Sequence, residues 1–86
     1  QSSAEAFERV AAQWATLGNS EMELIGRLNL IECLLELESP PDGARRNQVN
    51  GLLEVCSNLL KPLRSPHLEG VLDGHRERAL SLFALS

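Results

Sequence analysis

Two cysteines and two histidines are the side chains of this sequence best suited to nucleophilic or metal chemistry. Cys33 and Cys56 are 23 residues apart, and His67 and His75 are eight residues apart. Helical zinc sites place two histidines four residues apart and zinc loops contain C-x-x-C, so the spacing predicts no metal site. Catalysis would need folding to bring His75 to Cys56 beside an acid. We expect no catalytic residue and no cofactor.

Both cysteines fall at apolar positions of expected helices. We therefore expect buried free thiols in a reducing compartment and a cytoplasmic location, with a disulfide between the two helices as the alternative. The longest apolar stretch is interrupted by Glu32, Glu36 and Glu38, which predicts no membrane span.

Arg45 and Arg46 are the most unusual charged pair, because they follow two prolines in "ELESPPDGARRNQVNGLLE" and precede renewed helical spacing. Cations at a helix start oppose the positive end of the helix dipole, so local helix energetics do not explain them. One interpretation pairs them with Glu36 or Glu38 across the turn. The other interpretation is a binding patch, in which they and the free amides of the helix start hold an anion.

The net charge argues against nucleic acid as a partner. Eight basic residues stand against twelve acidic ones, for a formal charge of -4, whereas phosphate binding rests on a basic surface. The alternative hypothesis is a regulator that binds a nucleotide or RNA through an arginine cluster near the 39–46 turn, with Arg45, Arg46, Arg64, Arg76 and Arg78.

Two helices are predicted before the prolines. The first begins near Ser2 or Ser3, where Ser2 and Glu5 fit a capping box, and ends at Gly18 and Asn19. Its apolar stripe consists of Phe7, Val10, Ala11, Trp14 and Leu17, and we expect Trp14 to pack in the core. The second is expected over residues 21–38, with Ser20 and Glu23 as a second capping box, and its apolar face is wide enough for neighbours on two sides.

Two more helices are predicted after the prolines. Asp42 is expected to cap a helix over residues 43–61, in which Gly51 would allow another helix to approach closely. Ser65 and Pro66 are expected to open the last helix, which continues toward the C-terminus. Short connections between these helices favour antiparallel neighbours, so the predicted fold is all-α, a small up-down bundle of four helices, or three long helices with a looser terminal one.

The chain of 86 residues is long enough for one domain. Its start, "QSSAEAFERV", lacks both a signal-peptide pattern and an initiator methionine, so we expect residues 1–86 to form a single helical domain of a longer chain. More leucines occur on the middle helices than one narrow stripe needs. This favours a noncatalytic interaction domain that binds a protein partner or a second copy as a homodimer, through Leu24, Leu28, Ile31, Leu35, Arg45 and Arg46.

Residues 8–53 resemble part of a known helical family. "RVAAQWATLG", with Trp14 and Gly18, is followed by "ECLLELESPPDGARRNQVNGL", in which a leucine-rich helix ends in "LESPPD" before a basic helix start. The combination resembles the C-terminal part of bacterial proteins that carry the family called domain of unknown function 349. The resemblance implies an intracellular bacterial helical module and supplies no catalytic residues. Strongly charged coiled-coil-like helices of that family are not present in this sequence.

Overall fold

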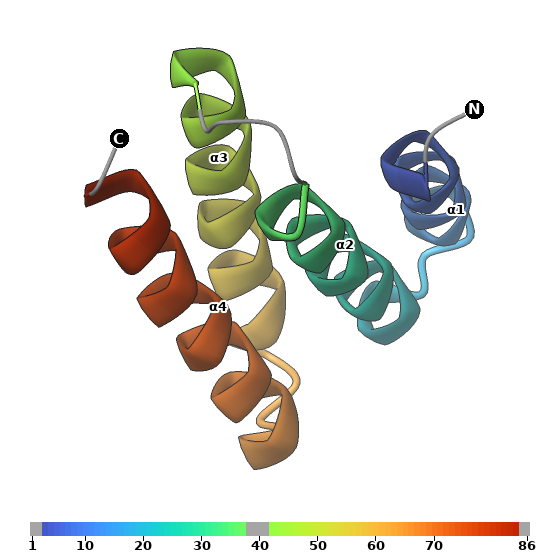
Figure 1. The fold of residues 1–86 in the computed structure, drawn as a ribbon. Coiled ribbons are helices and arrows are strands. Elements are labelled where there is room, and N and C mark those ends of the chain that lie inside the picture. The colour runs from blue at the N-terminus through green and yellow to red at the C-terminus, as the bar shows by residue number, and fades with distance from the viewer. Residues whose placement is uncertain (1–2, 38–41, 85–86) are drawn as a thin grey trace.

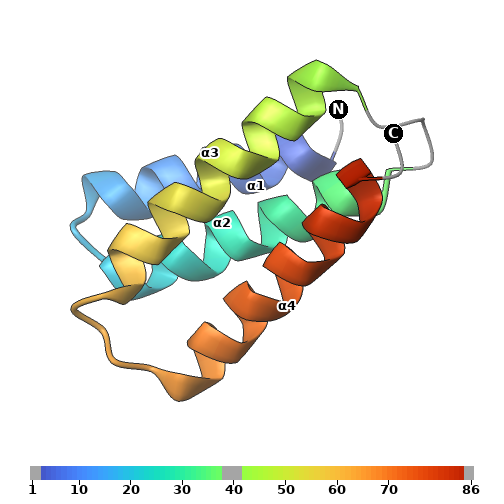
Figure 2. The same ribbon diagram turned by 90° about the vertical axis from the view of Figure 1, so that its left-hand side faces the viewer.

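The part of the chain that the structure describes folds into four helices (Figure 1). A computed structural model describes residues 3–37 and 42–84. The helices are α1 (Ser3–Thr16), α2 (Ser20–Leu35), α3 (Gly43–Leu60) and α4 (Pro66–Ala84). Successive helices run in alternating directions (Figure 2), so the predicted small all-α, up-down bundle is confirmed. Over these residues no helix combines the length and the apolar character that crossing a membrane requires.

Asn19 takes part both in the hydrogen bonds that end α1 and in the N-cap that starts α2. Gly18 has a φ of 75°, and the amides of Gly18 and Asn19 donate to the carbonyls of Ala15 and Trp14, the pattern of a Schellman ending. The side chain of Asn19 then accepts a hydrogen bond of 3.1 Å from the amide of Met22. The predicted stop at Gly18 and Asn19 is confirmed. The predicted cap at Ser20 is wrong, because Ser20 is already helical and Asn19 is the N-cap.

The C-terminal end of α2 lies earlier in the sequence than predicted. The helix ends at Leu35 with Glu36 as its C-cap, not near Glu38. Residues 38–41 lie outside the described part of the chain, as does Ser2 of the proposed first capping box. The cap of α3 is as predicted: the Asp42 carboxylate accepts a hydrogen bond of 2.7 Å from the amide of Arg45.

The connection from α3 to α4 also follows the sequence signals. Ser65 Oγ accepts from the amide of Leu68 at 3.3 Å, and Pro66 occupies the first helical position. Arg64, just before this cap, has a φ of 48°, a left-handed conformation that is uncommon for a residue with a side chain. The chain reverses direction here between α3 and α4.

Helix α2 is the centre of the molecule. It contacts each of the other helices, whereas α1 packs against α2 alone among the described residues (Figure 1). Helices α3 and α4 pack on α2 and on each other. The wide apolar face predicted for this segment is therefore used on two sides, which confirms that expectation. The largest fully buried side chains are Leu24, Leu30, Ile31, Val49 and Cys56.

Helices α1 and α2 approach each other most closely at Gly26. A Cβ atom on Gly26 would lie 3.2 Å from the Cβ and 3.4 Å from the Cα of Ala11, which is fully buried. At Gly51 a Cβ would meet nothing within 4 Å. The predicted close approach at Gly51 is wrong, because this part of α3 faces open space. The glycine that allows close packing is in α2.

Trp14 is half-buried and does not have the core position that we expected. Helix α1 has one neighbour, so only the side of its apolar stripe nearest α2 is covered. Ala11 lies on that side, and Phe7 packs against the edge of the core. The other side of the stripe remains accessible.

Candidate functional site

Four of the residues predicted to bind a partner lie in the interior. Leu24, Leu28, Ile31 and Leu35 are all buried in the core cluster that α2 forms with α3 and α4. In this conformation they stabilise the fold and are not available at the surface. A contact surface for another protein must therefore be built from other residues.

Arg45 is the fifth of those residues, and it closes the end of α2. Its side chain is 7% exposed, and Nη1 donates hydrogen bonds to the carbonyls of Leu34 at 3.2 Å and Leu37 at 3.4 Å. The last carbonyls of a helix have no partner within the helix and carry partial negative charge. A buried guanidinium at this position satisfies both needs.

Arg46, the sixth residue, has the equivalent role at α4. Its Nη2 donates to the carbonyl of Phe83 at 3.3 Å, in the last turn of α4. The up-down topology places the start of α3 beside the ends of α2 and α4, so two cations that are unfavourable for their own helix favour its neighbours. The predicted pairing of the arginines with Glu36 or Glu38 stays a prediction, although Glu36 lies 3.9 Å from Arg78. Glu38 lies outside the described residues.

The five arginines of the alternative hypothesis do not all lie on one surface, although Arg46, Arg64 and Arg76 line neighbouring hollows between α3 and α4. Arg76 lies 3.7 Å from Asp73 on its own helix, and Arg78 is held near the end of α2. Arg64 lies in the α3–α4 connection. Arg45 is buried, so the proposed five-arginine site does not form as one surface.

The two cysteines are free thiols, as expected, but only Cys56 is buried and Cys33 is partly exposed, so the expected burial of both is wrong for Cys33. Neither thiol has an activated environment. Burial raises the pKa of the Cys56 thiol to about 11, with a smaller opposing effect from Arg27 and a smaller raising effect from Glu23. Burial and the nearby carboxylates of Glu36 and Glu32 raise the pKa of Cys33. A nucleophilic thiol needs the opposite shift. Over the described residues, no group of three or more potential ligands is arranged to hold a metal ion.

His75 is a buried residue of α4 that lies beside α2. Burial lowers its pKa, an effect that outweighs the nearby carboxylate of Glu32 and a hydrogen bond to the backbone of Leu28. Arg78 adds to the lowering, and Glu36 opposes it. These groups belong to the C-terminal half of α2 and to α4, whereas Cys56 is influenced by Arg27 and Glu23 in the N-terminal half of α2. His75 is therefore a neutral packing residue near pH 7.

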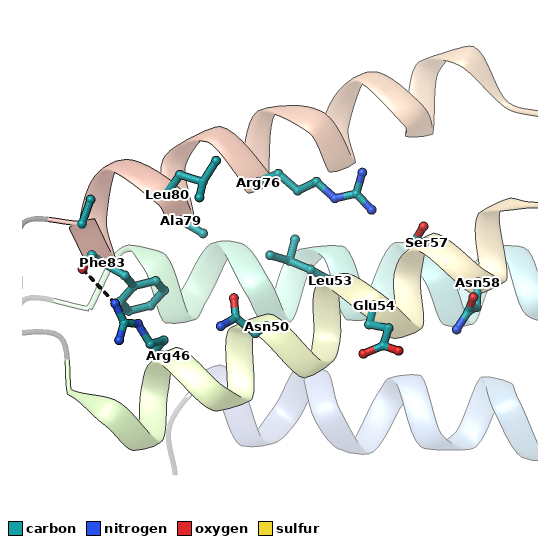
Figure 3. A pocket seen from close by; sticks show the side chains of 11 residues that line it. Arg46, Asn50, Leu53, Glu54, Ser57, Asn58, Arg76, Ala79, Leu80 and Phe83 are labelled. Atoms are coloured by element: carbon teal, nitrogen blue, oxygen red, sulfur yellow. Dashed lines mark hydrogen bonds between the residues drawn. The ribbon is translucent and has the colours of Figure 1, made fainter.

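A concave surface of about 650 Å³ lies between α3 and α4 (Figure 3). Its apolar part comes from both helices: Leu53, Ala79, Leu80 and Phe83. Its polar part comes mostly from α3: Arg46, Asn50, Glu54, Ser57, Asn58 and Arg76. Figure 3 shows the Leu53 side chain pointing toward α4, with Leu80 above the same space.

The concave surface continues toward the α3–α4 connection. A second hollow of about 590 Å³ shares Ser57 and Arg76 with the first and extends to Lys61, Arg64 and Pro66. The two hollows together form one groove, which we call the α3–α4 groove. Leu80 at its edge is 72% exposed, whereas Ala79 and Phe83 are buried beneath it. An open groove with an apolar floor and polar edges suits a helix better than a small ligand, which needs enclosure.

Sequence reasoning missed this groove for a physical reason. Leu53 has the same helical spacing as the core residues of α3, and only the packing of α3 and α4 on α2 decides which apolar residues remain outside. Of the six predicted site residues, Arg46 alone lines the groove. A signal was available in Leu80, which lies beside the buried Ala79 and so on a different face of α4.

No family model, curated protein or solved structure matches this chain. The resemblance of residues 8–53 to the bacterial helical family therefore stays a prediction.

Proposed function

We propose that this chain is a noncatalytic helical interaction module, and that the α3–α4 groove receives an apolar helix face from a protein. The observation that supports the proposal is the combination of an apolar floor with an exposed leucine at its edge. Leu80 is 72% exposed beside the buried Phe83 and the half-buried Leu53. Helix-in-groove recognition uses surfaces of this kind, with apolar anchors in the groove and polar contacts along the edges.

The polar residues along the edges of the groove favour one orientation of a bound helix along the groove. Asn50, Glu54 and Asn58 follow one another at four-residue intervals along α3, so they lie on one face and border the floor as a row. Arg76 faces this row from α4 (Figure 3). Polar residues at the rim of an apolar contact contribute to orientation and exclude water from its centre.

The cellular setting belongs to the same proposal. Two unpaired thiols suit a reducing compartment, and we propose the cytoplasm. A bacterial origin is supported only by the resemblance of residues 8–53. The acidic net charge favours a protein partner over the alternative of a nucleotide or RNA.

A library of helical peptides tests the proposal. Peptides of about 15 residues match the length of the groove at about 1.5 Å per residue. We expect selection on the wild-type chain to enrich amphipathic peptides, and Leu80→Glu to weaken their binding at least about tenfold, because full burial of a leucine is worth about 1.5–3 kcal/mol.

The matched control is Val55→Glu, since Val55 is an exposed apolar residue of α3 that does not line the groove. The control should leave peptide affinity unchanged. Enriched peptides that bind both variants equally, or no enrichment of amphipathic sequences, would argue against the groove as a binding surface.

A further inference from the structure

Helix α1 carries an apolar stripe that its own chain covers only in part. Phe7, Val10, Trp14 and Leu17 follow one another at positions i, i+3, i+7 and i+10, which places them on one side of a helix. Val10 is 43% and Leu17 is 72% exposed, and Phe7 and Trp14 are half-buried. Because α2 is the only neighbour of α1 in the described chain, the outer edge of the stripe faces away from the bundle.

The stripe and the groove match in length. The groove extends along α3 from Arg46 to Lys61, about 22 Å of helix, and α1 with its 14 residues is about 21 Å long. Amphipathic helices that bind grooves present anchors on successive turns. The stripe supplies such anchors on a helix that is already folded, so binding would not require the ordering of a flexible segment.

The charges of the two halves are opposite. Residues 1–42, which include α1 and α2, contain two basic and eight acidic residues. Residues 43–86, which form both sides of the groove, contain six basic and four acidic residues. At the contact itself, α1 carries two of these acids and one of these bases, and the groove lining carries four bases and three acids. A contact between α1 and the groove therefore joins surfaces of opposite net charge, whereas a contact between two grooves joins surfaces of like net charge.

We infer that the occupant of the α3–α4 groove is the α1 stripe of a second copy of this chain. The inference rests on the proposed function and names the partner of that groove. The contact is heterologous: one copy contributes α1, and the other contributes α3 and α4. Heterologous contacts either close into a ring, of which a pair is the smallest, or continue as an open chain.

Two single variants test the two sides of the contact. Leu17→Glu changes the stripe and Leu80→Glu changes the groove, and each residue is 72% exposed, so neither substitution disturbs the core. Leucine and glutamate have similar helix propensities, and circular dichroism verifies the fold. In sedimentation velocity runs over a range of concentrations, we expect the wild type to self-associate and each variant to associate at least tenfold more weakly.

Mixing the variants is the decisive experiment. The Leu17→Glu chain keeps a native groove and the Leu80→Glu chain keeps a native stripe, so an equal mixture should form a pair held by one native contact. Neither variant alone should form this pair. Val55→Glu is the control substitution, and it should associate like the wild type.

Three results would overturn the inference: a wild-type chain that is monomeric at every concentration, a Leu17→Glu chain that associates normally, and a mixture that remains monomeric. If either variant is unfolded, Val10→Glu replaces Leu17→Glu and Asn50→Glu replaces Leu80→Glu, because these residues are exposed on the same two surfaces. A monomeric chain that still selects groove-binding peptides would overturn the second copy as occupant and leave the proposed function standing.

Discussion

At the scale of single residues, the structure explains why Arg45 and Arg46 occur at the start of a helix. Two cations at a helix start are locally unfavourable, and sequence reasoning offered only nearby acids or a ligand to explain them. The structure shows that both also donate to carbonyls at the ends of two other helices. Those partners depend on tertiary arrangement, so no spacing rule along the chain reveals them.

Replacing Arg45 should cost more stability than replacing Arg46. Arg45→Ala leaves the carbonyls of Leu34 and Leu37 without a buried donor, and we expect the free energy of unfolding to fall by about 2 kcal/mol. Arg46→Ala, at an exposed position, should cost about 1 kcal/mol or less. Urea unfolding of both variants checks the difference. Equal losses would contradict the capping role assigned to Arg45.

His75 makes the stability depend on pH. Burial lowers its pKa in the folded chain from the ordinary value of 6.5, so the unfolded chain takes up its proton first as the pH falls. We therefore expect the free energy of unfolding to be highest above pH 6.5 and to fall as the pH drops below that value. Once His75 is protonated in the folded chain as well, this loss should stop. Glu32 and Glu36 oppose the shift, and Arg78 reinforces it.

The measurement is chemical unfolding of the wild type, His75→Gln and the control His67→Gln across this pH range. His75→Gln should reduce the loss of stability toward acid pH, whereas His67→Gln, at an exposed position, should not. If the wild type and His75→Gln lose stability in parallel, His75 is not the group that titrates.

At the scale of the helices, local signals predicted most boundaries. Gly18, Asp42 and Pro66 act within a few residues of the chain, so their caps could be read from the sequence. Packing between helices could not be read in the same way. Gly26 and Gly51 both occur inside helices, and only the position of α1 shows which glycine has a neighbour.

The two glycines should respond differently to alanine. Gly51→Ala adds helix propensity and meets no atom, so we expect stability to rise by up to about 1 kcal/mol. Gly26→Ala should bring no gain, because its Cβ would crowd both the side chain and the backbone of Ala11. Thermal unfolding of the two variants is the test. Similar gains would show that α1 moves away from α2 without cost.

At the scale of the whole molecule, the composition argues against some classes of function but does not identify one. A net charge of -4 argued against nucleic acid, yet the division of that charge between an acidic first half and a basic second half matters more for assembly. The fold class followed from helical spacing and short connections. The groove did not, because its position depends on how α3 and α4 pack on α2.

Salt should weaken self-association. Raising the ionic strength from about 0.01 M to about 1 M shortens the screening length from about 30 Å to about 3 Å, which removes the attraction between unlike halves. We expect a several-fold rise in the dissociation constant measured by sedimentation. A purely apolar contact would keep or increase its affinity under the same change.

The most direct test of the central claim is an amide chemical-shift map of the isotope-labelled chain as unlabelled chain is added. Head-to-tail docking predicts shift changes in two separate regions, one along the α1 stripe near Val10 and Leu17 and one along the α3–α4 groove near Leu53 and Leu80. The Leu80→Glu chain, when labelled, should lose the groove changes and keep those on α1 when wild-type chain is added. Changes confined to one region, changes on other surfaces, or no changes at the highest concentration would contradict the account.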